Sequence, residues 1–211
     1  MKTENLICIL AADAALRRSF ASRFASMLAC GIAIAAIAFL SLVGFRHDLP
    51  EAAQSLRFLF KFVVMLGLAV IAIVIARRSG SPNGDMRRWT KAIAFIPMLL
   101  AGAVVLELVS LPSGEWAHRL VGHDAWRCMA LIPFLSAGPL ACMLVALRHG
   151  APAQPGLAGA MAGLAASGIA TTLYAMNCAD DSPLFIATWF SLAILIVTTA
   201  GYLAGRRLLV W

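Results

Sequence analysis

Two of the five cysteines in this sequence lie where a thiol can do chemistry. Cys128 and Cys178 each stand at the edge of a long apolar segment, whereas Cys30 and Cys142 fall inside such segments and are expected to be small buried hydrophobic residues. If Cys128 and Cys178 lie at one level, they can form a disulfide in an oxidising compartment or share a soft metal ion. The nearby residues that can add metal ligands are His118, His123, Asp124, Asp180 and Asp181.

No enzyme motif accompanies these thiols. Their spacing matches no standard zinc pattern, and the sequence has no CxxC, no HExxH, no Gly-rich phosphate loop and no GxSxG nucleophile elbow. The sequence therefore does not indicate an enzyme. From spacing alone, a sensing or redox role and a purely structural role both remain open for Cys128 and Cys178.

The segments that must position these residues are typical of a membrane protein. The chain is 62% hydrophobic and only 13% charged, against about 25% charged residues in soluble domains. A helix needs about 20 apolar residues to cross the hydrocarbon core of a bilayer. Six segments qualify, and they predict an all-α polytopic protein with transmembrane helices at 24–45, 58–76, 92–111, 129–147, 156–176 and 184–204.

The sequence divides into an N-terminal arm, residues 1–23, and a six-helix bundle, residues 24–211. The arm is long and contains two acids, which argues against a cleaved signal peptide and for a retained first helix. Leu6, Ile7 and Leu10 fall at helical spacing. The arm can therefore be an amphipathic helix on the membrane surface, or a segment that folds on a cytosolic protein partner.

The positive charges predict the orientation. With both termini on the inner side, the inner segments hold twelve of the 17 lysines and arginines and the outer segments hold five. The positive-inside rule then places both termini in the cytoplasm and arranges the helices as three antiparallel hairpins. The net charge of +7 follows from this topology and indicates no binding to nucleic acid.

Few polar residues fall inside the predicted spans. Lys61 and Glu107 are the main charges there, both near the outer end, and Lys61 can extend its ammonium group outward into water. The two can pair with each other, although a structural role is the favoured interpretation. GxxxG spacings at Gly159–Gly163 and Gly201–Gly205 predict close helix packing within the bundle.

Residues at the start of the chain and in its second half form a recognisable pattern. At the start, the pattern includes segments 1–7 (MKTENLI) and 10–13 (LAAD). In the second half, it includes 126–128, Pro133, Pro139, Tyr174, Asn177, Cys178, 181–185, Trp189 and 205–208. Taken over the whole chain, this pattern resembles the NrsF-type family of six-helix membrane anti-sigma factors. The sequence departs from the family at 14–19 (AALRRS), where a proline-rich segment is expected.

The resemblance implies a multi-pass protein of the bacterial inner membrane. Such a protein binds an extracytoplasmic-function sigma factor on its cytoplasmic face and releases it under heavy-metal or oxidative stress. The family's two outward-facing cysteines match Cys128 and Cys178, with a transient soft metal ion as a candidate ligand and no resident cofactor. Within the arm, the resemblance implies that Leu6, Ile7, Leu10 and Asp13 contact the sigma factor.

Two other classes of membrane protein use similarly placed thiols. A small metal-ion transporter needs further ligands deeper in the bundle, for which Cys30 and Cys142 are the candidates. A membrane thiol oxidoreductase would use Cys128 and Cys178 catalytically, and the lack of a CxxC pair argues against it.

Overall fold

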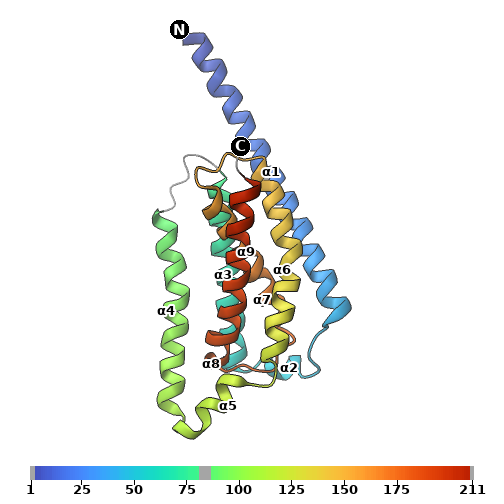
Figure 1. The fold of residues 1–211 in the computed structure, drawn as a ribbon, viewed down its shortest axis with the longest axis vertical. Coiled ribbons are helices and arrows are strands. Elements are labelled where there is room, and N and C mark those ends of the chain that lie inside the picture. The colour runs from blue at the N-terminus through green and yellow to red at the C-terminus, as the bar shows by residue number, and fades with distance from the viewer. Residues whose placement is uncertain (1–2, 81–86, 210–211) are drawn as a thin grey trace.

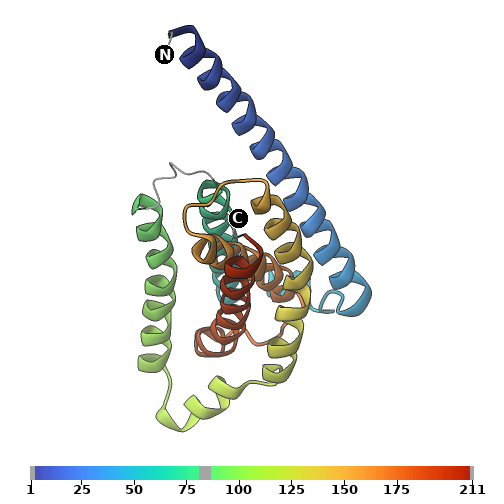
Figure 2. The same ribbon diagram turned by 45° about the horizontal axis from the view of Figure 1, so that its top comes forward.

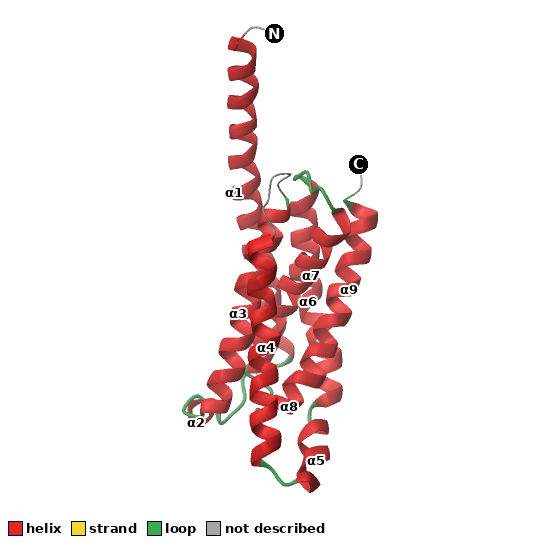
Figure 3. Cartoon of the chain, turned by 90° about the vertical axis from the view of Figure 1, so that its left-hand side faces the viewer, coloured by secondary structure: helices red, strands yellow, loops and turns green. Residues whose placement is uncertain are grey.

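The computed structural model describes residues 3–80 and 87–209, with the side chains of 20–80, 91–112 and 114–209. Within these residues every element is helical (Figure 3). Six helices are long and apolar enough to cross a membrane, which confirms the all-α fold and the six predicted apolar segments. These spans are Phe20–Leu42, Leu56–Ser79, Lys91–Ser110, Trp116–Arg148, Pro155–Ala175 and Pro183–Leu208.

The long helices alternate with short ones that cap the bundle. The long helices are α1 (Thr3–Leu42), α3 (Leu56–Ser79), α4 (Arg87–Ser110), α6 (Ala125–Arg148), α7 (Pro155–Ala175) and α9 (Ser191–Leu208). The short elements are α2 (Leu49–Ala52), η1 (Ser113–Glu115), α5 (Trp116–Val121), α8 (Pro183–Phe185) and the π-helical turn η2 (Ile186–Phe190). Because α2, α5 and α8 lie at one end (Figure 1), we call residues 43–55, 107–128 and 176–185 the cysteine end. The start of α1 and the end of α9 lie at the opposite end, here called the arm end (Figure 1).

Local sequence signals explain where several helices begin. The Ser55 side chain accepts a hydrogen bond of 3.2 Å from the backbone N–H of Phe58 and caps the start of α3. Prolines occupy the first turn of α2, α7 and α8, where the missing N–H would have no partner within the helix.

Helix α7 lies at the centre of the bundle, between α9, α3 and α6. Its small residues permit this close packing. A Cβ atom added at Gly163 would lie 2.7 Å from the carbonyl oxygen of Val197, and one added at Gly168 would lie 2.7 Å from the Cα of Ala69. Gly159 faces Gly201 and Gly205 on α9 in the same way, which confirms the predicted packing role of the two GxxxG segments.

Helix α1 packs along α6 and then extends past the bundle. A Cβ atom at Gly31 would lie 2.8 Å from the Cα of Pro139, and one at Gly138 would lie 2.6 Å from the Cγ2 of Ile34. The helix runs without a break across residue 23, the predicted boundary of the arm. Its first part, 3–19, projects beyond the arm end (Figures 1 and 2).

Helix α4 lies at the edge of the bundle, against α3 and, near the cysteine end, α8 (Figure 1). The buried apolar side chains form two clusters. The cluster toward the arm end includes Phe24, Met143 and Leu147, and the second includes Phe39, Ile132 and Phe190. Cys128 and Cys178 belong to the second cluster, so both thiols are part of the packed interior.

Candidate functional site: a buried thiol pair under a charged loop

The structure brings Cys128 and Cys178 into direct contact. Cys128 lies in the first turn of α6, and Cys178 lies in the loop between α7 and α8. Neither side chain is exposed to solvent, and no disulfide joins them. Their thiols are close enough to interact, and Tyr174 lies beside Cys128 in the same core cluster. The two cysteines singled out from the sequence therefore lie side by side in the packed interior.

The charge on the Cys178 thiol is influenced by its neighbours. A hydrogen bond from the Cys128 thiol lowers the pKa of Cys178, and the nearby positive charge of Lys61 acts in the same direction against the effect of burial. A thiolate is the nucleophilic and metal-binding form of cysteine. Of the two sulfurs, Cys178 is therefore the one whose thiolate form is favoured by its surroundings.

Two basic side chains hold the loop that carries Cys178. Lys61 on α3 donates to the carbonyl oxygen of Cys178 at 2.9 Å and lies 2.5 Å from the carboxylate of Asp181. Arg46 lies 3.2 Å from the other carboxylate oxygen of Asp181. The Asn177 amide donates to the carbonyl oxygen of Gly44 at 3.1 Å. The loop is therefore tied to the segment after α1 and to α3.

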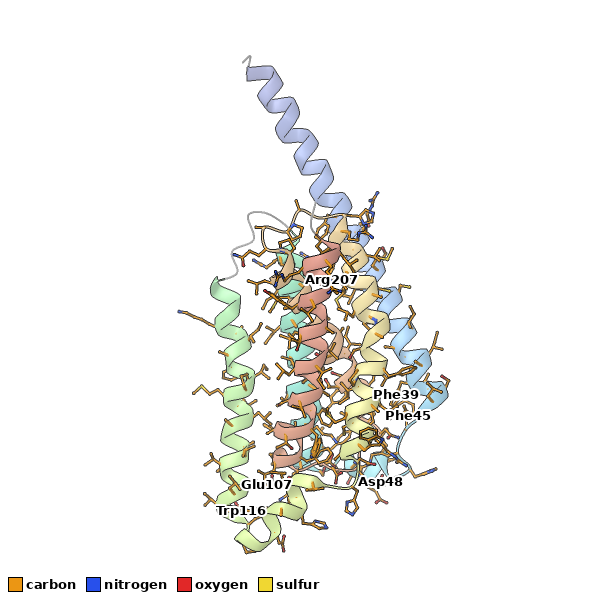
Figure 4. The ribbon with its side chains drawn as sticks, in the orientation of Figure 1. Phe39, Phe45, Asp48, Glu107, Trp116 and Arg207 are labelled. Carbon is orange, nitrogen blue, oxygen red and sulfur yellow. The ribbon has the colours of Figure 1, made fainter. Side chains whose placement is uncertain are left out.

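Lys61 has the structural role that was the favoured interpretation, but neither of the two contacts considered possible for it is present. The side chain does not extend into water, since it is fully buried, and its acidic partner is Asp181 rather than Glu107. Glu107 on α4 instead accepts hydrogen bonds from the Ser182 hydroxyl at 2.8 Å and from the backbone N–H of Leu184 at 3.0 Å. The free N–H groups at the start of α8 favour a carboxylate there. Figure 4 shows Glu107 and Asp48 at the cysteine end, and Arg207 at the arm end.

Asp180 connects the Cys178 loop to the start of α6. One of its carboxylate oxygens accepts hydrogen bonds from the backbone N–H groups of His123, at 2.9 Å, and Asp124, at 3.1 Å. The Cys178 sulfur and carboxylate oxygens of Asp124 and Asp180 all lie within 4.8 Å of one another. A thiolate and two carboxylates form a reasonable set of ligands for a divalent metal ion.

The two histidines lie above this group, in a cleft of about 510 Å³ lined also by Glu115, Arg119 and Asp180. Their rings meet edge to face with centroids 5.7 Å apart. His123 is exposed, and its Nδ1 lies 3.8 Å from a carboxylate oxygen of Asp180. Of the predicted auxiliary ligands, Asp180 lies beside Cys178, and the two histidines line the cleft. Asp181 pairs with Lys61 and Arg46.

Arg46 was not among the residues we singled out from the sequence. Besides Asp181, it pairs with Asp48 at 2.6 Å, and this contact lowers the pKa of the Asp48 carboxyl to about 2. An arginine after an apolar segment is common, so its position alone could not indicate a role in holding Cys178. The side chains of Leu6, Ile7, Leu10 and Asp13 lie outside the described residues, and their contact with a sigma factor stays a prediction.

The second pair of cysteines differs from the prediction. Cys142 is half-buried but Cys30 is exposed on the surface of the bundle, so the expectation of a buried Cys30 was wrong. The physical reason is that α1 covers α6 with only one of its faces, and an apolar outer face is stable against lipid.

Comparison with known proteins finds relatives that match the whole chain. A protein of Azospira oryzae named "Probable anti-sigma-F factor NrsF" is 34% identical over 215 residues, with all of both chains covered. The "Anti-sigma-F factor NrsF" of Caulobacter vibrioides is also 34% identical, over 216 residues, with all of both chains covered. No solved structure matches the chain. The family model described as "Negative regulator of sigma F" matches residues 10–211, and the chain therefore belongs to the NrsF family.

Proposed function

We propose that this protein is an inner-membrane anti-sigma factor that holds an extracytoplasmic-function sigma factor inactive and releases it under heavy-metal or oxidative stress. The observation that carries the proposal is the full-length similarity to two relatives whose names describe them as anti-sigma-F factors. A regulatory role also agrees with the lack of enzyme motifs in the sequence.

In this proposal the arm end faces the cytoplasm. The distribution of lysine and arginine supports that orientation, because the inner-side segments hold most of them. Residues 3–19 continue α1 beyond the bundle at this end, and a free helix of that length is a suitable surface for a protein partner (Figure 2). Leu6, Ile7, Leu10 and Asp13 are the proposed contacts with the sigma factor.

Cys128 and Cys178 are the proposed sensors, on the outer side. Their contact supports either a disulfide or a shared soft metal ion, with Asp124 and Asp180 as further ligands. Either modification removes the hydrogen bond between the thiols and changes the loop that Lys61 and Arg46 hold. Since Cys128 belongs to α6, and α6 packs along α1, the rearrangement has a continuous path of packed helices to the arm.

The energetic requirement is substantial. Changing a partner from about 99% bound to about 99% free takes roughly 5.5 kcal/mol of differential free energy between two states. Bonds between two thiols and a soft metal, or a disulfide, are strong enough when only one arrangement of the helices allows them to form.

The test is co-purification of the cognate sigma factor with the full-length protein extracted from membranes. We expect capture by the wild type and by the C128S/C178S double variant, and none by a chain lacking residues 3–18. A full-length variant carrying L6A, I7A, L10A and D13A controls for the length of the arm and should lose capture as well. Failure of the wild type to capture the sigma factor would overturn the proposed function. Capture by the shortened chain would overturn only the role of the arm.

The response to stress is tested separately, with a reporter gene that depends on the sigma factor. We expect the C128S/C178S variant to keep the reporter silent when cadmium or an oxidant is added, whereas the wild type releases it. With cadmium as the inducer, a C30S/C142S variant is the matched control, because it removes two thiols elsewhere in the bundle. Normal induction in the C128S/C178S variant would show that other groups sense the signal.

A further inference from the structure

A second pair of thiols lies far from the first, on the two helices that connect the cysteine end to the arm. Cys30 on α1 and Cys142 on α6 lie close enough for their side chains to interact. They stand beside the tightest part of the α1–α6 interface, where an added Cβ atom at Gly31 would lie 2.8 Å from the Cα of Pro139 and 3.4 Å from the Cβ of Cys142. The two helices are therefore close enough at this level for side chains on neighbouring positions to meet.

The pair opens toward the outside of the bundle. Cys30 is exposed and Cys142 is half-buried. Cys30 lies ten residues after the start of its span at Phe20 and twelve before its end at Leu42. At about 1.5 Å per residue this depth is about 15 Å, close to the middle of a hydrocarbon core about 30 Å thick. A reagent therefore reaches the pair through the lipid rather than through water.

The two helix segments that carry Cys30 and Cys142 hold no charged residue that could balance the charge of an ionic complex. The segment 24–42 of α1 and the segment 128–147 of α6 contain no Lys, Arg, Asp or Glu. A net charge at this depth costs several kcal/mol. Two thiolates balance a divalent cation, whereas a monovalent soft cation would leave one negative charge. Zinc normally completes a set of four ligands, and the pair offers two sulfurs.

We propose that Cys30 and Cys142 form an intramembrane binding site for a divalent soft metal that accepts two sulfur ligands, with Hg(II) as its representative. The ion arrives as neutral mercuric chloride, which can enter the bilayer. Two S–H bonds and two Hg–Cl bonds break, two S–Hg bonds form, and the protons leave with the chlorides as two molecules of hydrogen chloride. No atom changes oxidation state, and the product is neutral.

Such a complex joins α1 to α6. Because α1 is one continuous helix, a metal at this position restrains the same helix that carries residues 3–19. The site is separate from Cys128 and Cys178, and its existence does not depend on binding to a sigma factor.

The experiment uses the full-length protein with C8S, C128S and C178S substitutions, reconstituted in phosphatidylcholine vesicles and titrated with mercuric chloride. We expect one Hg(II) per chain, and one equivalent should protect both remaining thiols from N-ethylmaleimide, as counted by mass spectrometry. In the same background, C30S or C142S should bind at least ten-fold more weakly. Excess cadmium should not protect the pair.

Helical folding of every variant is checked by circular dichroism. A charged mercurial that does not enter lipid is the control for mercuric chloride. We expect that probe to leave both thiols reactive in intact vesicles. Uptake of two Hg(II) ions per chain, one on each thiol, would overturn the proposal, as would equal binding by the C30S variant.

Discussion

The Nζ atom of Lys61 lies 2.5 Å from Oδ1 of Asp181, and the Lys61 side chain is fully buried. The same ammonium group also donates to the carbonyl oxygens of Cys178, at 2.9 Å, and Asp180, at 3.4 Å. One buried cation thus holds the loop that presents Cys178. Breaking a buried ion pair by removing one partner typically costs about 3–5 kcal/mol, because the remaining charge stays buried without compensation.

We predict that D181N destabilises the protein more than K61M. In D181N the buried Lys61 keeps only carbonyl partners, whereas in K61M Asp181 still pairs with Arg46 at 3.2 Å. We expect D181N to lower the free energy of unfolding by about 3 kcal/mol. This appears as a lower midpoint of unfolding in mild detergent. The K61M/D181N double variant should recover part of this loss. D48N is the control, since Asp48 is exposed and should matter little. Equal midpoints for D181N and the wild type would contradict the prediction.

The reactivity of Cys178 should depend on Cys128. The hydrogen bond from Cys128 lowers the pKa of Cys178, so C128A should raise that pKa and slow alkylation by iodoacetamide near neutral pH. The measurement is the alkylation rate against pH in a C8S/C30S/C142S background. A midpoint that does not move upward in C128A would show that the hydrogen bond does not control the thiolate.

The interaction between Cys128 and Cys178 should also make the stability of the fold depend on pH. The folded-state pKa of Cys178 is lowered, so the interaction stabilises the fold above the pKa that the thiol has in the unfolded chain. This stabilisation is lost as the pH falls through the lower, folded-state pKa. The unfolding midpoint of the wild type should therefore show a step over that range that C178S lacks.

Packing at the centre of the bundle should be sensitive to a single methyl group. In G163A the added Cβ atom would lie 2.7 Å from the carbonyl oxygen of Val197, so α7 and α9 must move apart. We expect G163A to lower the free energy of unfolding by about 1–3 kcal/mol. In G102A on α4 the added atom meets nothing within 4 Å, and replacing glycine in a helix should be neutral or favourable by up to about 1 kcal/mol. Similar unfolding midpoints for the two variants would contradict the packing in the structure.

The proposed orientation is tested with reporter fusions. Green fluorescent protein fused after Trp211 should fluoresce, whereas alkaline phosphatase fused there should be inactive, because the C-terminus is proposed to lie in the cytoplasm. Alkaline phosphatase fused within the 111–115 segment should be active. The opposite pattern would reverse the orientation and place Cys128 and Cys178 inside.

Lys61 and Cys30 illustrate where prediction from the sequence ended. A lysine near the end of an apolar segment commonly extends toward water, and nothing local in the sequence indicated that Asp181 would cover it. The exposure of Cys30 depends on which face of α1 contacts α6. In a membrane helix the lipid-facing and protein-facing sides are both apolar, so the pattern of hydrophobic residues does not distinguish them.

The sequence by itself determined the helical class, the six apolar spans and the small-residue faces of α7 and α9, because these depend on hydrophobic length and residue size along a single helix. The sequence also indicated Cys128 and Cys178 as the candidate functional cysteines. Only the tertiary structure decided that these two cysteines lie together, that Lys61 and Arg46 hold the loop of Cys178, and that Cys30 lies near Cys142. Each of these contacts joins segments far apart in the chain, and it exists because of how the helices pack rather than because of any local pattern.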